Sequence, residues 1–105
     1  MRKFKVLLQG RNLLIFSFDE QMAVKRGVYI VRLVEAVDEI VAPHAALEDF
    51  RLDPKGIKLR ESLQNAANDP PVFEAVEITE LESFGTAVNG GFIFYPENEK
   101  DWPSE

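Results

Sequence analysis

Cysteine is entirely missing from this sequence of 105 residues. Its absence excludes a disulfide scaffold, a thiol enzyme, an iron–sulfur protein and a zinc site built on thiolates. The sequence also has a single histidine and no apolar run of membrane-spanning length. What remains is 46% apolar and 29% charged residues, a composition typical of one globular domain rather than of a disordered chain.

Charge is unevenly distributed along the sequence, whose formal net charge is −6. Residues 1–35 hold seven bases and three acids, whereas residues 69–105 hold one base and nine acids. Such an acidic total argues against DNA as a partner. Either basic and acidic strands lie side by side and neutralise each other, or the molecule presents an acidic face to a basic partner.

The first ten residues are basic and then apolar, as at the start of a signal peptide. Lys5 interrupts the apolar stretch, Gln9 and Gly10 end it, and no small-residue cleavage site follows. We therefore expect a cytoplasmic protein that does not enter a membrane.

The first third of the sequence has the period of β-strands. Residues 3–8 alternate between apolar and polar, residues 13–18 are almost wholly apolar, and residues 28–37 are rich in β-branched side chains. Between the first two, Gln9-Gly10-Arg11-Asn12 is typical of a turn, because glycine and asparagine tolerate left-handed backbone. The pattern predicts a hairpin at 9–12 and a third strand after it.

The period changes to that of a helix after Val37. Apolar side chains and one histidine recur at helical spacing at Val37, Ile40, Val41, His44 and Leu47. A helix capped by Asp38 would contain Pro43, so it either kinks there or begins there. Asp53-Pro54 predicts the start of a second helix, which the spacing of Leu59, Leu63, Ala66 and Ala67 continues up to the break at 68–71.

Strand character returns in residues 72–84 and 92–95, with a tight turn expected at Asn89-Gly90. The predicted order is β-β-β-α-α-β-β. It indicates an α+β fold, with an antiparallel sheet of about five strands and one or two helices packed on one face. We expect one domain over residues 1–96 and a polar C-terminal tail over 97–105.

His44 is the first residue to weigh as a catalytic or metal-binding group. It lies four residues before Glu48, a spacing that could bring two ligands to one metal. A metal site needs further ligands, however, and His44 also falls on the apolar stripe of its helix. We therefore expect a histidine packed in the core or at its boundary, with no metal and no cofactor, and keep an enzyme using His44 with nearby carboxylates as the alternative.

Four glutamates crowd the strand at 72–84, and Glu80 and Glu82 share one of its faces. Paired carboxylates can do acid–base chemistry, but a solvated face that discourages strand aggregation is the simpler interpretation. Further on, Tyr95 and Trp102 stand beside Pro96 and Pro103. They could anchor a protein partner or a second copy, or the tail could fold back on its own domain.

A third alternative is RNA binding. Arg2, Lys3, Lys5 and Arg11 are interleaved with Phe4 in the first predicted hairpin, as on a surface that binds single strands. The aromatic residue there falls on the core-facing alternation, and the net charge opposes such a surface.

Several segments together resemble a family of small uncharacterised bacterial α+β proteins. These segments are 29–38, the break Asp69-Pro70-Pro71, 73–81, and the ending Gly91 to Glu97. The resemblance implies a fold and carries no activity or site residues. Our leading hypothesis is a non-enzymatic protein–protein interaction domain that binds a protein partner or forms a homodimer, with Tyr95, Trp102, Glu80 and Glu82 as candidate contacts.

Overall fold

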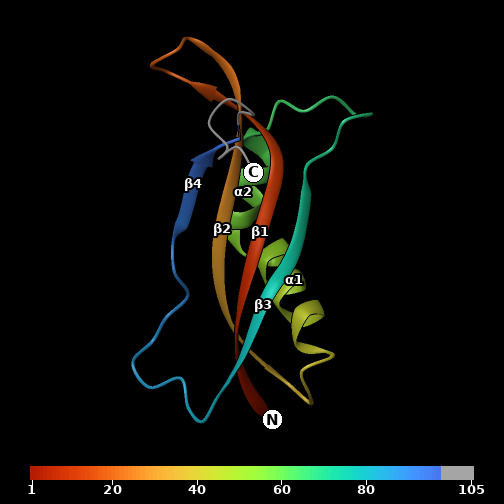
Figure 1. Ribbon diagram of the computed structural model, residues 1–105, viewed down its shortest axis with the longest axis vertical. Coiled ribbons are helices and arrows are strands. Elements are labelled where there is room, and N and C mark those ends of the chain that lie inside the picture. Colours follow the sequence, from red (N-terminus) through yellow and green to blue (C-terminus); the bar gives the residue numbers. More distant parts are fainter. Residues whose placement is uncertain (98–105) are drawn as a thin grey trace, which may run out of the picture.

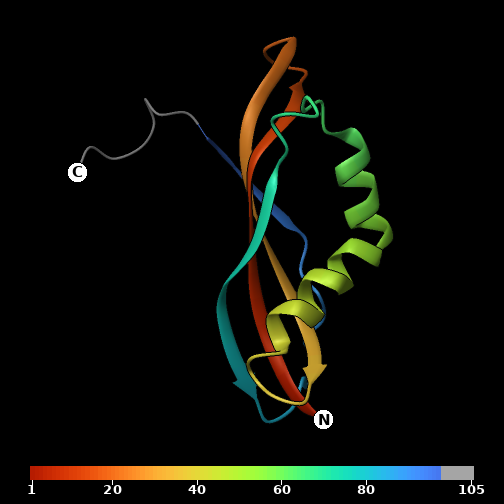
Figure 2. The same cartoon turned by 90° about the vertical axis from the view of Figure 1, so that its right-hand side faces the viewer.

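The computed structural model describes residues 1–97, in which two helices cover one face of a four-stranded antiparallel sheet (Figure 1). The elements are β1 (Arg2–Ser17), β2 (Met22–Ala36), α1 (Ala42–Leu52), α2 (Pro54–Ser62), β3 (Val72–Leu81) and β4 (Phe92–Pro96). The strands lie in the order β3-β1-β2-β4. Figure 2 shows both helices on the same side of the strands. The predicted α+β class is confirmed, with four strands in place of five.

The missing fifth strand is explained by a β-bulge where a turn was predicted. Residues 2–17 form one continuous strand, and its register with β2 shifts between Gly10 and Leu13. Asn12 has a left-handed backbone there, with φ of 62°. A bulge needs the same permissive residues as a turn, but it bends the strand and does not reverse it. The hairpin turn lies later, at residues 18–21.

Hydrogen bonds from distant parts of the chain hold the bulge. The Asn12 amide donates to the carboxylate of Glu97, over 2.9 and 3.1 Å to its two oxygens. The Asn12 side chain donates to Asp69 Oδ1 over 2.8 Å, and Asn65 Nδ2 donates to the Asn12 carbonyl over 2.7 Å. The bulge therefore fastens the end of β4 and the segment after α2 to β1.

The first helix begins at Ala42, with Pro43 in its first turn, where a missing N–H costs no hydrogen bond. Asp38 lies before the helix and accepts from the amides of Ile40 and Val41, each over 2.9 Å. The predicted stripe is therefore wrong. Its first three residues, 37, 40 and 41, precede the helix and are exposed, and the buried residues of α1 are Ala42, Ala46 and Phe50.

The second helix begins as predicted. Asp53 is its N-cap, and the Asp53 side chain accepts from the Lys55 amide over 2.8 Å. It ends at Ser62, five residues before the predicted end. The next residues bond to β1, because Gln64 N–H donates to the Leu14 carbonyl and Leu14 N–H donates to Asn65 Oδ1. These bonds to the sheet replace the continuation of the helix.

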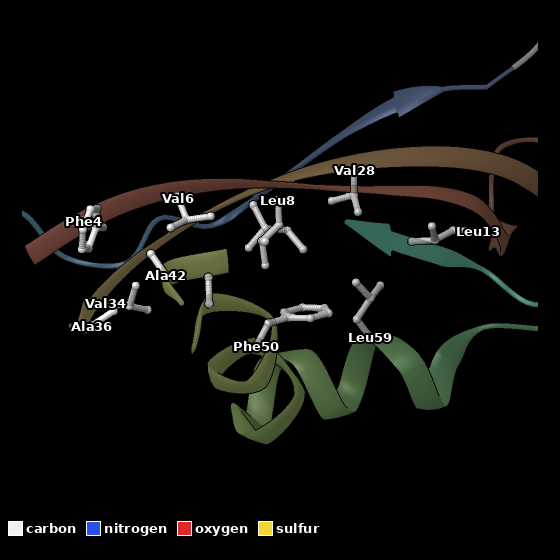
Figure 3. Packing of buried hydrophobic residues seen from close by; sticks show 12 residues of the cluster. Phe4, Val6, Leu8, Leu13, Val28, Val34, Ala36, Ala42, Phe50 and Leu59 are labelled. Atoms are coloured by element: carbon white, nitrogen blue, oxygen red, sulfur yellow. The ribbon is translucent and has the colours of Figure 1, made fainter. Parts of the chain in front are cut away.

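The core lies between the helices and the covered face of the sheet. In Figure 3, Phe50 and Leu59 point from the helices toward side chains of β1 and β2. The Phe50 ring lies 5.1 Å from the Phe73 ring and 5.9 Å from the Phe92 ring, between centroids. Phe50 thus joins α1 to both edge strands.

Arg32 is the only buried charged residue in the described part of the chain, at 2% exposure. Its Nε lies 2.8 Å from Asp49 Oδ2, and its Nη2 lies 2.8 Å from Asp53 Oδ2. Burial lowers the pKa of Arg32, but the hydrogen bonds to Asp53 and Asp49 outweigh it, so the pKa is raised. The same guanidinium lowers the pKa of Asp53. Arg32 thereby links β2 to both helices.

Candidate functional site

Strand β4 is one edge of the sheet and has a neighbour on one side only within residues 1–97. Its sequence, Phe-Ile-Phe-Tyr-Pro, carries no charge. Ile93 is 66% exposed and Phe94 is 45% exposed. An exposed, uncharged edge strand is a template on which another strand can pair.

On this outer side, the backbone groups of β4 have no neighbouring strand within residues 1–97. The Glu97 amide donates to the Lys25 carbonyl over 3.2 Å, so it points inward, toward β2. Because amides alternate in direction along an antiparallel strand, those of Tyr95 and Ile93 also point inward. The amides and carbonyls of Phe92 and Phe94 therefore point outward. Pro96 shares that outward direction and offers only a carbonyl, because proline has no N–H.

Tyr95 fixes β4 to the rest of the sheet. Its ring stacks on Tyr29, with centroids 5.0 Å apart and planes 28° apart, and its hydroxyl accepts from Gln9 Nε2 over 2.7 Å. Burial raises the pKa of Tyr95, although the bond from Gln9 acts in the opposite direction. The ring covers Gly27, where a Cβ would lie only 2.0 Å from Tyr95 Cζ. Tyr95, a predicted contact residue, thus makes its main contacts within the chain.

Strand β3 forms the opposite edge and carries Glu74, Glu77 and Glu80. Glu80 accepts two hydrogen bonds of 2.8 Å from Arg2, which lower the pKa of Glu80. Glu74 lies 3.0 Å from Arg11. The acidic strand therefore lies beside the basic first strand, as the first interpretation of the charge pattern expected.

The structure does not bring the predicted contact residues together. Tyr95 lies on β4, Glu80 lies near the end of β3 at the opposite edge, and Glu82 is exposed just beyond that end. Trp102 lies outside the described residues.

A surface depression of about 410 Å³ lies between α2 and the start of β4. It is lined by Lys55, Lys58, Leu59, Gly91 and Phe92. Leu59 and Phe92 give it an apolar lining, and the two lysines bring positive charge to it. No local sequence pattern indicates this site, because α2 and β4 are thirty residues apart along the chain. The available signals were the pair of lysines at 55 and 58 and the alternation of Phe92 and Phe94.

His44 is exposed on α1, so the expectation of a packed histidine is wrong. Glu48, its candidate partner, is held by Arg51 through a bond of 3.1 Å to Nε. Among residues 1–97, no three acidic or histidine side chains gather closely enough to hold a metal ion.

The basic N-terminal strand differs from the surface that RNA binding requires. Phe4 is buried in the core. Arg2 and Arg11 are ion-paired with β3, and Arg2 also lies over the Phe4 ring, 5.4 Å from its centroid. The aromatic ring and two of the cations are therefore already engaged within the chain.

Comparison with known proteins returned no matching family model, curated protein or solved structure. Both helices in the described part of the chain are too short and too polar to cross a bilayer.

Proposed function

We propose that this chain is a protein–protein interaction domain that acts as a homodimer, with the outer edge of β4 as its interface. One observation carries the proposal. β4 is an uncharged edge strand with exposed Ile93 and Phe94 and with outward-pointing backbone groups, in a chain of net charge −6. Adding a strand to such an edge is a common mode of protein recognition.

A second copy fits this edge because antiparallel pairing of β4 with itself is symmetric. With Phe94 on the twofold axis, Ile93 lies opposite the partner's Tyr95, and Phe92 lies opposite the partner's Pro96. Each contact then occurs twice, as in any isologous interface. Because β4 carries no charge, two copies of this acidic chain can pair here without placing like charges opposite each other. Self-pairing of an edge strand that carries carboxylates would place like charges together, which is destabilising.

The outward backbone groups match this register. The Phe94 amide donates to the partner's Phe94 carbonyl, and the Phe92 amide donates to the partner's Pro96 carbonyl. With their symmetry equivalents these make four hydrogen bonds, each contributing about 0.5–1.5 kcal/mol net. Pro96 leaves no amide unpaired, since it has none. Covering Ile93 and Phe94 adds hydrophobic stabilisation.

The test is a charge placed on the twofold axis. In Phe94→Glu two carboxylates would face each other across the interface, and we expect a monomer with an unchanged circular dichroism spectrum. Phe18→Glu is the matched control, because Phe18 is 81% exposed and lies in the hairpin turn far from β4. Native mass spectrometry and light scattering across a concentration series should find dimers for the original chain and for the control. A monomeric original chain, or a dimeric Phe94→Glu variant, would overturn the proposal.

A further inference from the structure

We infer that, in this dimer, the segment after β4 of one copy docks in the depression between α2 and β4 of the other copy, with Trp102 as its anchor. The inference rests on the proposed homodimer. It assigns an occupant to the depression lined by Lys55, Lys58, Leu59, Gly91 and Phe92.

The register of the strand pair brings this segment to the depression. With Phe94 on the axis, Pro96 faces the partner's Phe92, and Glu97 faces the partner's Gly91. Both of those partner residues line the depression. The chain beyond Glu97 therefore leaves the strand pair beside the partner's α2.

The depression of the same copy is much harder to reach. Phe92 lies five residues before Glu97 on an extended strand, which is a distance of about 16 Å at ~3.3 Å per residue. Trp102 lies only five residues after Glu97. A chain that first reverses its direction spends part of that length in the turn, and so falls short. The geometry therefore favours the partner's depression.

The chemistry of the segment complements the depression. Residues 98–105 contain Glu99, Asp101 and Glu105 with one lysine, and they surround the single tryptophan of the sequence. The depression offers Lys55 and Lys58, which have no carboxylate within ion-pair distance among residues 1–97. Leu59 and Phe92 supply an apolar floor for an indole ring. Its volume of about 410 Å³ can accommodate such a side chain.

Trp102 makes the inference directly measurable, because it is the only tryptophan and its fluorescence reports one position. At concentrations where native mass spectrometry shows the dimer, we expect blue-shifted emission and protection from acrylamide quenching. Lys55→Gln combined with Lys58→Gln should shift the emission to that of the unfolded chain while the dimer persists. Lys3→Gln combined with Lys5→Gln, which removes the same charge from β1, should change neither.

A mixing experiment separates docking between copies from docking within one copy. One copy carries Trp102→Phe and keeps its depression; the other keeps Trp102 and carries the Lys55→Gln and Lys58→Gln changes. Mixing the two should restore blue-shifted emission in the mixed dimers. Mixed dimers that keep red-shifted emission would overturn the inference, as would a dimeric Lys55/Lys58 variant whose emission stays blue-shifted. Either result would leave the proposed dimer intact, whereas a monomeric original chain would remove both.

Discussion

The two edges of the sheet protect themselves from pairing to very different degrees. The β3 edge is ten residues long, and its glutamates 74 and 80 are paired with arginines of β1. The β4 edge is five residues long, and it has neither charge nor bulge. Charged side chains on an edge strand discourage pairing with another chain. The contrast supports the proposal that the uncharged β4 edge pairs with another strand, and the four predictions below test it.

The largest effect on stability should come from removing the ion pairs that join β2 to both helices, because these bonds support the whole sheet and not one edge of it. Asp49→Asn combined with Asp53→Asn leaves Arg32 buried without a countercharge, while asparagine can still cap α2. We expect a loss of about 3 kcal/mol in the free energy of unfolding, measured with urea. Asp19→Asn with Glu20→Gln removes two charges from the exposed turn and should cost almost nothing. Equal stability of the two double variants would show that the ion pairs of Arg32 contribute little.

The same ion pairs predict acid sensitivity. Because Arg32 lowers the pKa of Asp53 in the folded chain, this carboxylate stabilises the fold above about pH 4, the pKa range of unfolded aspartate. The contribution is lost as the pH falls through the folded pKa. Unfolding free energies measured between neutral and acidic pH should therefore fall more steeply for the original chain than for Asp53→Asn. Parallel curves would contradict the assignment.

A smaller effect, confined to the β4 edge, should follow from Gly27→Ala. The new methyl group would overlap the Tyr95 ring, and we expect a cost of about 1–3 kcal/mol together with a weaker dimer. Gly90→Ala is the control, since its Cβ would meet Val31 at an ordinary 3.8 Å. Thermal unfolding measures the first effect and a dilution series the second. If Gly27→Ala leaves the dimer affinity unchanged, the interface does not depend on the position of Tyr95.

Removing the charges of the β3 edge should allow β3 to pair with another chain, as we propose for β4. Replacing Glu74, Glu77 and Glu80 by threonine keeps β-propensity and removes three carboxylates. We expect species larger than a dimer in light scattering, with little change in unfolding free energy, because exposed ion pairs contribute less than about 1 kcal/mol. The control removes the same charge from Glu20, Glu39 and Glu61. If both variants scatter alike, net charge rather than edge protection keeps β3 unpaired.

Local patterns of the sequence predicted most of the elements. Alternation located β3 and β4, and the Asp53-Pro54 pair located the start of α2. The bulge at Asn12 was interpreted as a turn because glycine and asparagine permit both. The bonds that decide the matter come from Asn65, Asp69 and Glu97, more than fifty residues away. The early end of α2 is also due to bonds with distant residues, because Gln64 and Asn65 bond to Leu14 of β1.

The candidate site depends even more on distant neighbours. The sequence of β4 shows that the strand is apolar. Its place at an edge depends on the strand order, which local sequence patterns do not determine. Tyr95 was predicted to contact a partner, whereas its stacking on Tyr29 could not be anticipated from the sequence. The depression beside Phe92 needs α2 and β4 to meet, which only the tertiary fold determines.

The buried guanidinium of Arg32 also has a consequence for the way in which the molecule opens. One side chain on β2 holds a carboxylate of α1 and the N-cap of α2, so neither helix can leave the sheet without breaking a bond to the same group. We therefore expect α1, α2 and β2 to open as one cooperative unit. Their backbone amides should exchange with deuterated solvent in a single concerted event, while the hairpin turn at 18–21 exchanges independently and much sooner.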